Sequence, residues 1–202
     1  LYSSNALDNM QSRKTSEEDK NIAIKYKEAK QALIESVCDI ILCSVDKYEC
    51  VDGQFGLWHK AKCEEIMGTM NTAIFQDDSL ILKSNSFTYG LAQKWVNMTM
   101  KYLWLLDRLP EGLTAKSLHV PIDSFILEKL REENVDDIRR DGDTYKYKGK
   151  SWSQLDDYDV YLDIQTKIGQ IAGKTFPIEW EGPVWIKVAQ NRETRKKKQE
   201  RK

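Results

Sequence analysis

Several motifs that commonly mark enzymes are missing from this sequence of 202 residues. It contains neither G-x-x-x-x-G-K-[ST] nor G-x-G-x-x-G, so a glycine loop that cradles phosphate is not expected. It also lacks the G-x-S-x-G and H-E-x-x-H patterns of serine hydrolases and zinc proteases. The only two histidines, His59 and His119, are far apart in the chain. A histidine-based triad or metal site is therefore not expected, and no cofactor is indicated.

Long hydrophobic runs and paired cysteines are also absent. No run approaches the roughly 18 apolar residues of a membrane span, and no charged-then-apolar leader is evident, so neither membrane insertion nor secretion is expected. The four cysteines show no C-x-x-C spacing. Cys38 and Cys43 lie in an apolar helical pattern and are expected to be small core hydrophobes, with a zinc site completed by His59 as the less favoured alternative. A reducing, cytoplasmic location is the simpler interpretation.

The composition that remains is typical of a helical globular protein. Apolar residues make up 41% of the chain and charged residues 31%, with only four prolines. The formal net charge of -1 argues against a strongly basic nucleic-acid binder as a whole. The predicted fold class is all-α, a single helical domain of about six or seven helices over residues 16–190. Residues 1–15 are expected to be a tag remnant and a loose N-terminus, and residues 191–202 a basic C-terminal tail.

Apolar periodicity and capping residues place the individual helices. Ser84, Asn85 and Ser86 are the possible caps of the third helix, and Ser153 is expected to open the fifth. Gly182 and Pro183 are expected to kink or restart the last one. A short β-hairpin or loop is favoured near 144–150. The helices are expected at about 16–45, 55–75, 86–107, 123–133, 153–173 and from 177 onward.

The helix over 86–107 is the most apolar of the long helices, so its few polar residues are informative. Gln93, Asn97 and Lys101 recur every four residues and share one face, and Lys94 adjoins them. Two interpretations are open. These residues form the one solvated edge of a buried helix, or they line a cleft in which amide and ammonium groups meet a ligand.

Asp123 stands in an unusual local context. Pro121 forces the preceding Val120 to be extended, which places Asp123 at the first turn of the next helix. There it acts as an N-cap, worth about 1 kcal/mol, or takes part in a functional site.

The stretch from Ala92 to Trp104, followed after a loop by Val-Pro-Ile-Asp at 120–123, resembles the active-site half of the helix-hairpin-helix DNA glycosylases. The archaeal 8-oxoguanine glycosylase branch is the nearest likeness. That superfamily is all-α, with a lysine early in one helix and a carboxylate in an Ile/Val-Pro-Val-Asp turn before the next. The resemblance implies Lys94 and Asp123 as the catalytic pair, with Lys101 as the alternative lysine. The family's Leu-Pro-Gly-Val-Gly hairpin is replaced here by residues 85–90, with one glycine, and the four-cysteine cluster of some members is absent.

The resemblance also implies a chemistry, that of an N-glycosylase and abasic-site lyase. A flipped nucleoside would stack on Trp95 or Trp104. Lys94 would attack the sugar carbon as a neutral amine, and Asp123 would stabilise the positive charge that develops on the sugar and assist proton transfer. The expected substrate-binding residues are Gln93, Asn97, Lys101, Trp95 and Trp104.

Two basic segments suggest DNA as a partner. Residues 145–150 alternate aromatic and basic side chains, which suits a hairpin or a stacking surface. Residues 192–202 suit a solvated helix end or an arm on an anionic polymer. The alternative function is a non-catalytic helical module that binds nucleic acid or protein. The expected nucleic-acid contacts are Lys146, Lys148, Lys150, Arg195, Lys196, Lys197 and Lys198.

Overall fold

The computed structural model describes residues 17–45, 54–76, 87–133, 135, 137–140, 143–146 and 151–200. Within these ranges the predicted all-α class is confirmed, with a single two-stranded hairpin added. The elements in chain order are α1 (Glu17–Val45), α2 (Phe55–Gln76), α3 (Tyr89–Leu105), α4 (Ser124–Glu132), β1 (Asp137–Arg140), β2 (Asp143–Lys146), the 3-10 helix η3 (Trp152–Gln154), α5 (Tyr158–Ala172) and α6 (Pro177–Gln199).

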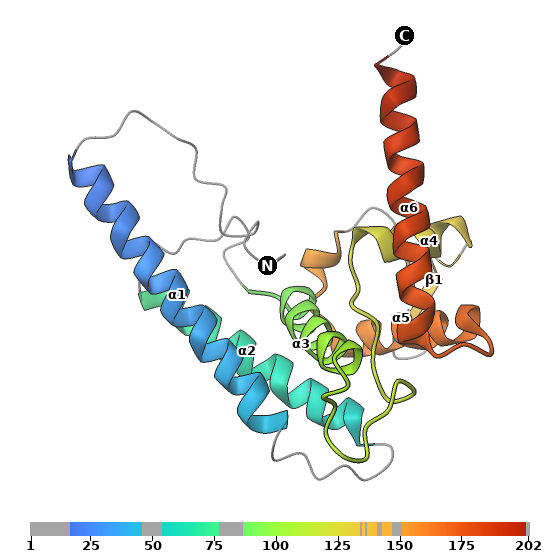
Figure 1. The fold of residues 1–202 in the computed structure, drawn as a ribbon, viewed down its shortest axis with the longest axis horizontal. Helices are drawn as coiled ribbons and strands as arrows, with labels where there is room; N and C mark the ends of the chain where they lie inside the picture. The colour runs from blue at the N-terminus through green and yellow to red at the C-terminus, as the bar shows by residue number, and fades with distance from the viewer. Residues whose placement is uncertain are drawn as a thin grey trace.

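Helix α3 is the centre of the arrangement. It contacts α2 on one side and η3 on the other, while α1 packs on α2 and α6 packs along α4. Figure 1 shows α3 between the α1–α2 pair and the group formed by α4, α5 and α6, with the end of α6 projecting from the body. None of the described helices combines the length and apolarity that crossing a membrane requires.

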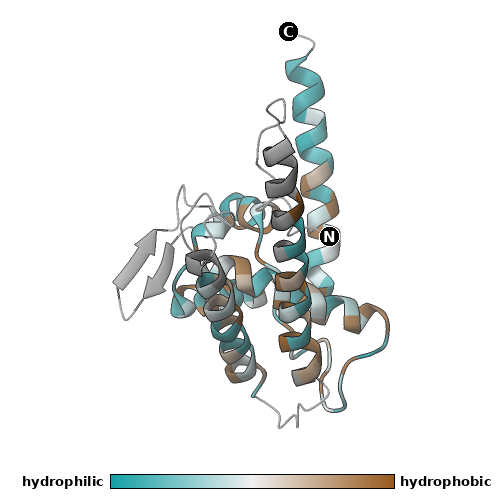
Figure 2. Cartoon of the chain, turned by 90° about the vertical axis from the view of Figure 1, so that its left-hand side faces the viewer, coloured by the Kyte–Doolittle hydropathy of each residue, from teal (hydrophilic) through white to brown (hydrophobic). Residues whose placement is uncertain are grey.

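The core is continuous across these helices. In the body of the protein, brown and teal alternate along the coloured helices of Figure 2, because apolar positions recur between polar ones. Fully buried side chains come from α2, α3, α4, α5 and α6 alike, because each presents one apolar stripe to its neighbours. Examples are Ile66, Val96, Ile126, Ile164 and Ile178.

Gly90 allows η3 to approach α3 closely. A Cβ at this position would lie 1.9 Å from the backbone oxygen of Trp152, so any larger residue would push η3 away. The Gly90 amide donates to the Leu155 carbonyl at 2.7 Å, and the Thr88 hydroxyl donates to the Ser153 carbonyl at 2.7 Å. Gly90 therefore joins two helices, and its amide is already used within the protein.

Several helix boundaries differ from the predicted ones. Thr88, not a hydroxyl at 84–86, caps α3, since its side chain accepts from the Leu91 amide. Ser151 caps η3 in a capping box with Gln154, and Asp157 caps α5, so Ser153 opens neither. Helix α6 runs without interruption through Pro183. Gly173 ends α5 with a positive φ of 66°, as its sequence position suggests.

The hairpin lies earlier in the chain than predicted. Strands β1 and β2 are antiparallel, with Asp137 opposite Lys146 and Arg140 opposite Asp143. The two residues between the strands read Asp-Gly, a strong hairpin turn sequence that explains this register. Of the predicted contacts in this region, Lys146 lies on β2, and Lys148 and Lys150 lie outside the described residues.

The histidines and cysteines occupy different places from those expected. Cys38 and Cys43 are exposed on α1, so they are not core hydrophobes. His59 is fully buried and contacts Cys63 one turn later on α2, with Sγ to Nε2 at 3.7 Å. No cluster suited to holding a metal ion occurs within the described ranges. Burial raises the pKa of the Cys63 thiol to about 12, which favours its neutral form.

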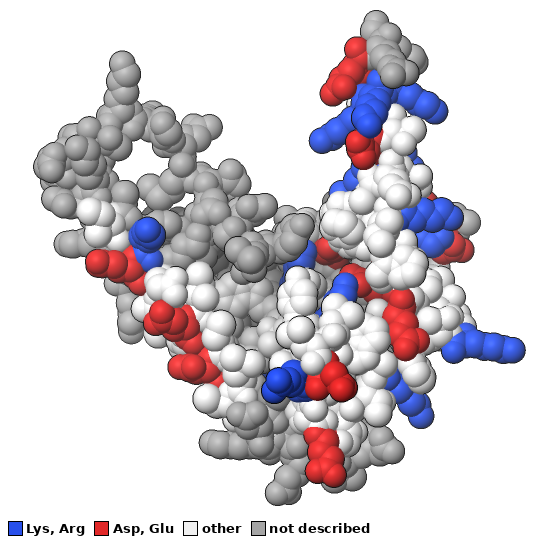
Figure 3. Space-filling model, in the orientation of Figure 1, with Lys and Arg blue, Asp and Glu red and all other residues white. Residues whose placement is uncertain are grey.

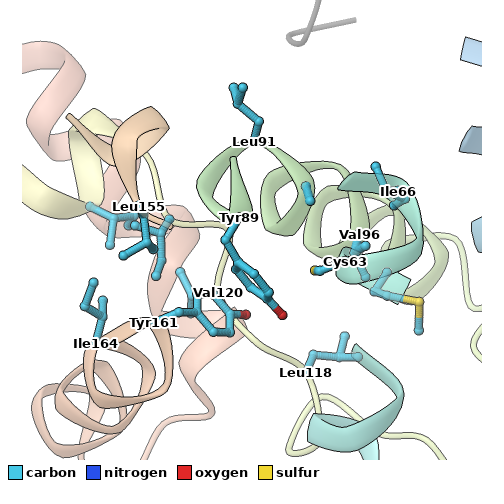
Figure 4. Close-up of a cluster of buried hydrophobic side chains, with 14 of the residues drawn as sticks. Cys63, Ile66, Tyr89, Leu91, Val96, Leu118, Val120, Leu155, Tyr161 and Ile164 are labelled. Carbon is cyan, nitrogen blue, oxygen red and sulfur yellow. The ribbon is translucent and has the colours of Figure 1, made fainter. Parts of the chain in front are cut away.

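Tyr161 links the two histidines inside the core. Its hydroxyl lies 2.8 Å from Nδ1 of His119 and 3.2 Å from Nε2 of His59, and its ring stacks on His59. Figure 4 shows Tyr161 and Tyr89 directed toward the region between α2 and the strand-like segment that carries Leu118 and Val120. His119 is thus a structural residue, as its position before Pro121 suggests.

Candidate functional site

The site is built on an extended segment that helix side chains hold by its backbone. Gln93 bonds both backbone groups of Ile122, donating to its carbonyl at 2.8 Å and accepting from its amide at 3.1 Å. Gln165 bonds both backbone groups of Val120 in the same way, at 2.7 and 3.0 Å. Because Pro121 has no N–H to satisfy, these bonds pair the backbone amides of residues 120–122. The extended segment 120–122 therefore holds Asp123, which follows it, in a fixed position.

Asp123 uses its two carboxylate oxygens differently. Oδ1 accepts from the amides of Phe125 at 2.8 Å and Ile126 at 3.1 Å, which makes Asp123 the N-cap of α4. Oδ2 accepts from Nζ of Lys94 and from Nε1 of Trp185, each at 3.4 Å. The capping interpretation and the functional-site interpretation are therefore compatible, because each uses its own oxygen.

Lys94 reaches this carboxylate from the first turns of α3. Its side chain is 15% exposed, and its ammonium nitrogen lies 4.7 Å from the centre of the Trp152 ring. A cation over an indole face is stabilised by the ring quadrupole. Lys94 thus sits between an aromatic face and a carboxylate, with part of its surface open to solvent.

Lys94 and Asp123 line one cavity of about 420 Å³, together with a second ion pair. Lys101 lies two turns after Lys94 on α3 and bonds the Glu181 carboxylate of α6. Glu181 is only 3% exposed. Burial raises the pKa of Glu181; Lys101 opposes this shift, and the Asp123 carboxylate adds to it. The volume lies within the roughly 300–1,000 Å³ of small-molecule sites.

Aromatic side chains form much of the remaining wall. Trp185 stacks on Phe125 with ring centres 4.5 Å apart, and Arg192 lies over the same ring at 4.1 Å. Arg192 also donates to the Ser124 carbonyl at 2.9 Å and to Glu128 at 2.7 Å. These contacts fix α6 to the first turn of α4. The full lining is Lys94, Met98, Lys101, Tyr102, Asp123, Ser124, Phe125, Trp152, Glu181 and Trp185.

The structure brings together three of the predicted site residues, Lys94, Lys101 and Asp123. Gln93 and Asn97 are fully buried and do not line the cavity. Asn97 donates to the Val120 carbonyl at 3.2 Å and contacts the Tyr161 hydroxyl at 3.0 Å. The polar edge of α3 is therefore divided: Lys94 and Lys101 line the cavity, whereas these two amides serve the protein's own backbone and core, so neither interpretation holds for all four residues.

The predicted aromatic residues also lie elsewhere. Trp95 packs edge-on against Phe87, with ring centres 5.7 Å apart, and Trp104 packs against the core. Neither lines the cavity, whose indoles are those of Trp152 and Trp185. The sequence gives one indication of Trp185, because Glu181 and Trp185 lie one helical turn apart and therefore share a face of α6.

The basic tail is part of α6. Arg195 pairs with Glu128 at 2.8 Å and Glu132 at 3.6 Å, and Lys197 pairs with Glu193 at 2.7 Å. The remaining predicted contacts, Lys196 and Lys198, are exposed. Figure 3 shows basic side chains gathered around the projecting end of this helix.

Searches for similar proteins give no relative for this chain. No family model, no curated protein and no solved structure matches it.

Proposed function

We propose that this protein is a DNA glycosylase-like enzyme that acts on a base flipped into the cavity through Lys94 and Asp123. One observation carries the proposal. The Lys94 amine lies 3.4 Å from a carboxylate oxygen of Asp123, and both groups line a cavity with aromatic walls. A deprotonated lysine amine can act as a nucleophile, and an adjacent carboxylate can activate it by accepting its proton.

The chemical step uses these two groups as follows. Lys94 first gives up a proton, and Asp123 Oδ2 is the acceptor in contact with it. The amine nitrogen then bonds to the sugar carbon C1′ while the bond from C1′ to the base breaks, and its electron pair leaves with the base. The proton that Asp123 took from Lys94 passes to the departing base, so Asp123 returns to the carboxylate and charges and protons balance. The bound amine opens the sugar to an imine, from which an abasic-site lyase step follows.

The substrate would be held by stacking and by charge. Trp152 and Trp185 offer indole faces at the cavity, and base–aromatic stacking is worth about 1–3 kcal/mol per base. Exposed lysines at the end of α6 would meet phosphates, since α6 also supplies Glu181 and Trp185 to the cavity. The free cysteines Cys38, Cys43 and Cys63 suit the reducing, cytoplasmic location that belongs to this proposal.

Release of damaged bases tests the proposal. The full chain would be incubated with duplexes that each carry one altered base, such as 8-oxoguanine, uracil or hypoxanthine. We expect release of at least one base, and loss of release by more than 100-fold in Lys94→Met and in Asp123→Asn. Lys62→Gln, which removes an amine that is ion-paired at 2.7 Å elsewhere, is the matched control. Full activity in both site variants, or no release by the unmodified chain, contradicts the proposal.

The second candidate is a non-catalytic module that binds nucleic acid through the end of α6. The exposed Lys196 and Lys198 on a projecting helix favour it. It predicts salt-dependent binding for which Lys94 is dispensable, so binding that is unchanged in Lys94→Met without any base release would support this function instead.

A further inference from the structure

We infer that the ion pair of Lys101 and Glu181 determines which bases the cavity accepts, by binding a lactam edge, a ring N–H beside a carbonyl oxygen. This inference rests on the proposed function and concerns its substrate class. The chemical step proposed for Lys94 and Asp123 leaves this second ion pair of the cavity unused. Because a buried ion pair is costly unless its remaining donors and acceptors are satisfied, these groups are expected to meet a polar ligand.

The pair keeps a donor and an acceptor free for that ligand. Lys101 donates to Oε2 of Glu181, and within the described residues this is the only hydrogen bond of either side chain. An ammonium has three N–H donors and a carboxylate has two oxygens, so N–H groups of Lys101 and Oε1 of Glu181 remain available. Glu181 is only 3% exposed but lines the cavity, so its free oxygen can be satisfied from within the cavity.

The ion pair places these groups next to each other. Because Lys101 and Glu181 are bonded, a donor and an acceptor lie side by side at the cavity wall. A lactam edge presents the complementary pair, since its carbonyl oxygen accepts from the ammonium and its ring N–H donates to the carboxylate. Each of these hydrogen bonds involves a charged group and is therefore stronger than a bond between neutral groups.

The position of the pair along α3 suits the far edge of a base. Lys101 lies two turns after Lys94, about 10 Å along the helix axis. A base whose bond to the sugar meets Lys94 and Asp123 therefore directs its opposite edge toward Lys101 and Glu181. The edge that these two residues meet is the one that distinguishes one base from another.

The charges of the lining disfavour another class of base. Each lining carboxylate is paired with a lysine, Asp123 with Lys94 and Glu181 with Lys101. A base that is positively charged after alkylation of a ring nitrogen finds no unpaired carboxylate among the described lining residues, and the two ammonium groups repel it. The substrate class is therefore a neutral base with an intact lactam, such as uracil or hypoxanthine.

Binding of three free purines tests which edge the cavity accepts. Hypoxanthine carries the lactam, 1-methylhypoxanthine lacks its ring N–H, and adenine carries an amino group beside a bare ring nitrogen. All three present a similar flat face, so stacking alone does not separate them. Quenching of tryptophan fluorescence measures binding, since Trp152 and Trp185 line the cavity. We expect hypoxanthine to bind about 10-fold or more tightly than either of the other two.

Variants of the ion pair test whether these two residues cause the preference. Lys101→Met/Glu181→Leu removes the pair without leaving a buried charge unpaired, and we expect the preference to fall to about 2-fold or less. Lys62→Met/Glu65→Leu, at an ion pair of α2 outside the lining, is the matched control and should keep the preference. In Glu181→Gln the amide offers a donor as well as an acceptor, so the preference over adenine should decrease.

Each outcome decides the question. Equal binding of the three purines by the unmodified chain, or no binding, overturns the inference, and this comparison needs no variant to fold. Tighter binding of adenine overturns it too, because the lactam would then not be the preferred edge. A preference that persists in Glu181→Gln and in the double variant overturns the role of the ion pair. Duplexes that carry hypoxanthine report on the proposed function separately: if the chain prefers free hypoxanthine but releases no base, the lactam site stands and the proposed function falls.

Discussion

Asp123 combines a helix cap and a cavity contact in one side chain, and two substitutions separate them. Asparagine retains an oxygen for the amides of Phe125 and Ile126, whereas alanine does not. We expect Asp123→Ala to lower the free energy of unfolding by about 1–2 kcal/mol, the usual effect of losing an N-cap, and Asp123→Asn to lower it much less. Urea unfolding measures both. Equal losses would show that the contact of Oδ2 with Lys94, and not the cap, dominates stability.

The buried histidines make a prediction about pH. Burial lowers the pKa of His119 to about 4 and lowers that of His59, to which neighbouring His119 also contributes. At His119 the unfolded chain binds a proton below about pH 6.5, whereas the folded chain does not until about pH 4. The free energy of unfolding is therefore highest above pH 6.5 and decreases as pH falls toward 4.

For His119 the loss amounts to about 2 kcal/mol between pH 7 and pH 5. Urea unfolding at the two pH values measures it, and His119→Gln, which cannot titrate, should show a smaller difference than the unmodified chain. The same pH difference in both proteins would mean that His119 accepts its proton as readily in the folded state as in the unfolded state.

At the scale of secondary-structure elements, the contact between α3 and η3 determines where Trp152 stands. Because a Cβ at Gly90 would meet the Trp152 backbone oxygen at 1.9 Å, Gly90→Ala should force η3 outward and cost about 1–3 kcal/mol. Gly68→Ala on α2 is the matched control, since its Cβ would meet nothing within 4 Å and alanine is the better helix former. Thermal unfolding of both variants provides the measurement. A Gly90→Ala protein as stable as the control would contradict the close contact.

The same elements show which parts of the site could be predicted from sequence. The pairing of Lys94 with Asp123 is implied by the resemblance to the DNA glycosylases, whereas local patterns, a periodic helix and a turn after Pro121, place each residue only within its own element. Gln93 and Asn97 were assigned to the wrong role, because successive helix residues point about 100° apart and only the path of residues 120–122 decides which face meets the cavity.

The aromatic wall could not be predicted for a different reason. Trp152 and Trp185 come from elements far later in the chain, and their approach depends on tertiary contacts that local periodicity does not specify. The hairpin position, by contrast, is indicated by the Asp-Gly pair at 141–142, which is a stronger turn signal than the alternating aromatic and basic residues after it.

Across the whole molecule the net charge is close to zero, but positively charged side chains gather on the projecting end of α6. Since Arg192 and Arg195 already bind Glu128, the exposed Lys196 and Lys198 are the residues most available to phosphates. We expect replacement of both lysines by glutamine to weaken duplex binding and to reduce the slope of log affinity against log salt by about 2.

Titrations of a labelled duplex at several salt concentrations measure this slope. The matched control replaces Lys116 and Lys174, two exposed lysines outside α6, and should leave the slope unchanged. Equal effects in the two double variants would mean that the projecting helix is not a preferred contact for nucleic acid.

The central claim is that the Lys94 amine is the nucleophile of this cavity. Borohydride trapping on an abasic-site duplex, followed by peptide mass spectrometry of the adduct, tests it most directly. We expect one adduct, carried by Lys94, which Lys94→Met abolishes and Lys101→Met does not. An adduct on Lys101 or on surface lysines, or no adduct at all, would contradict it.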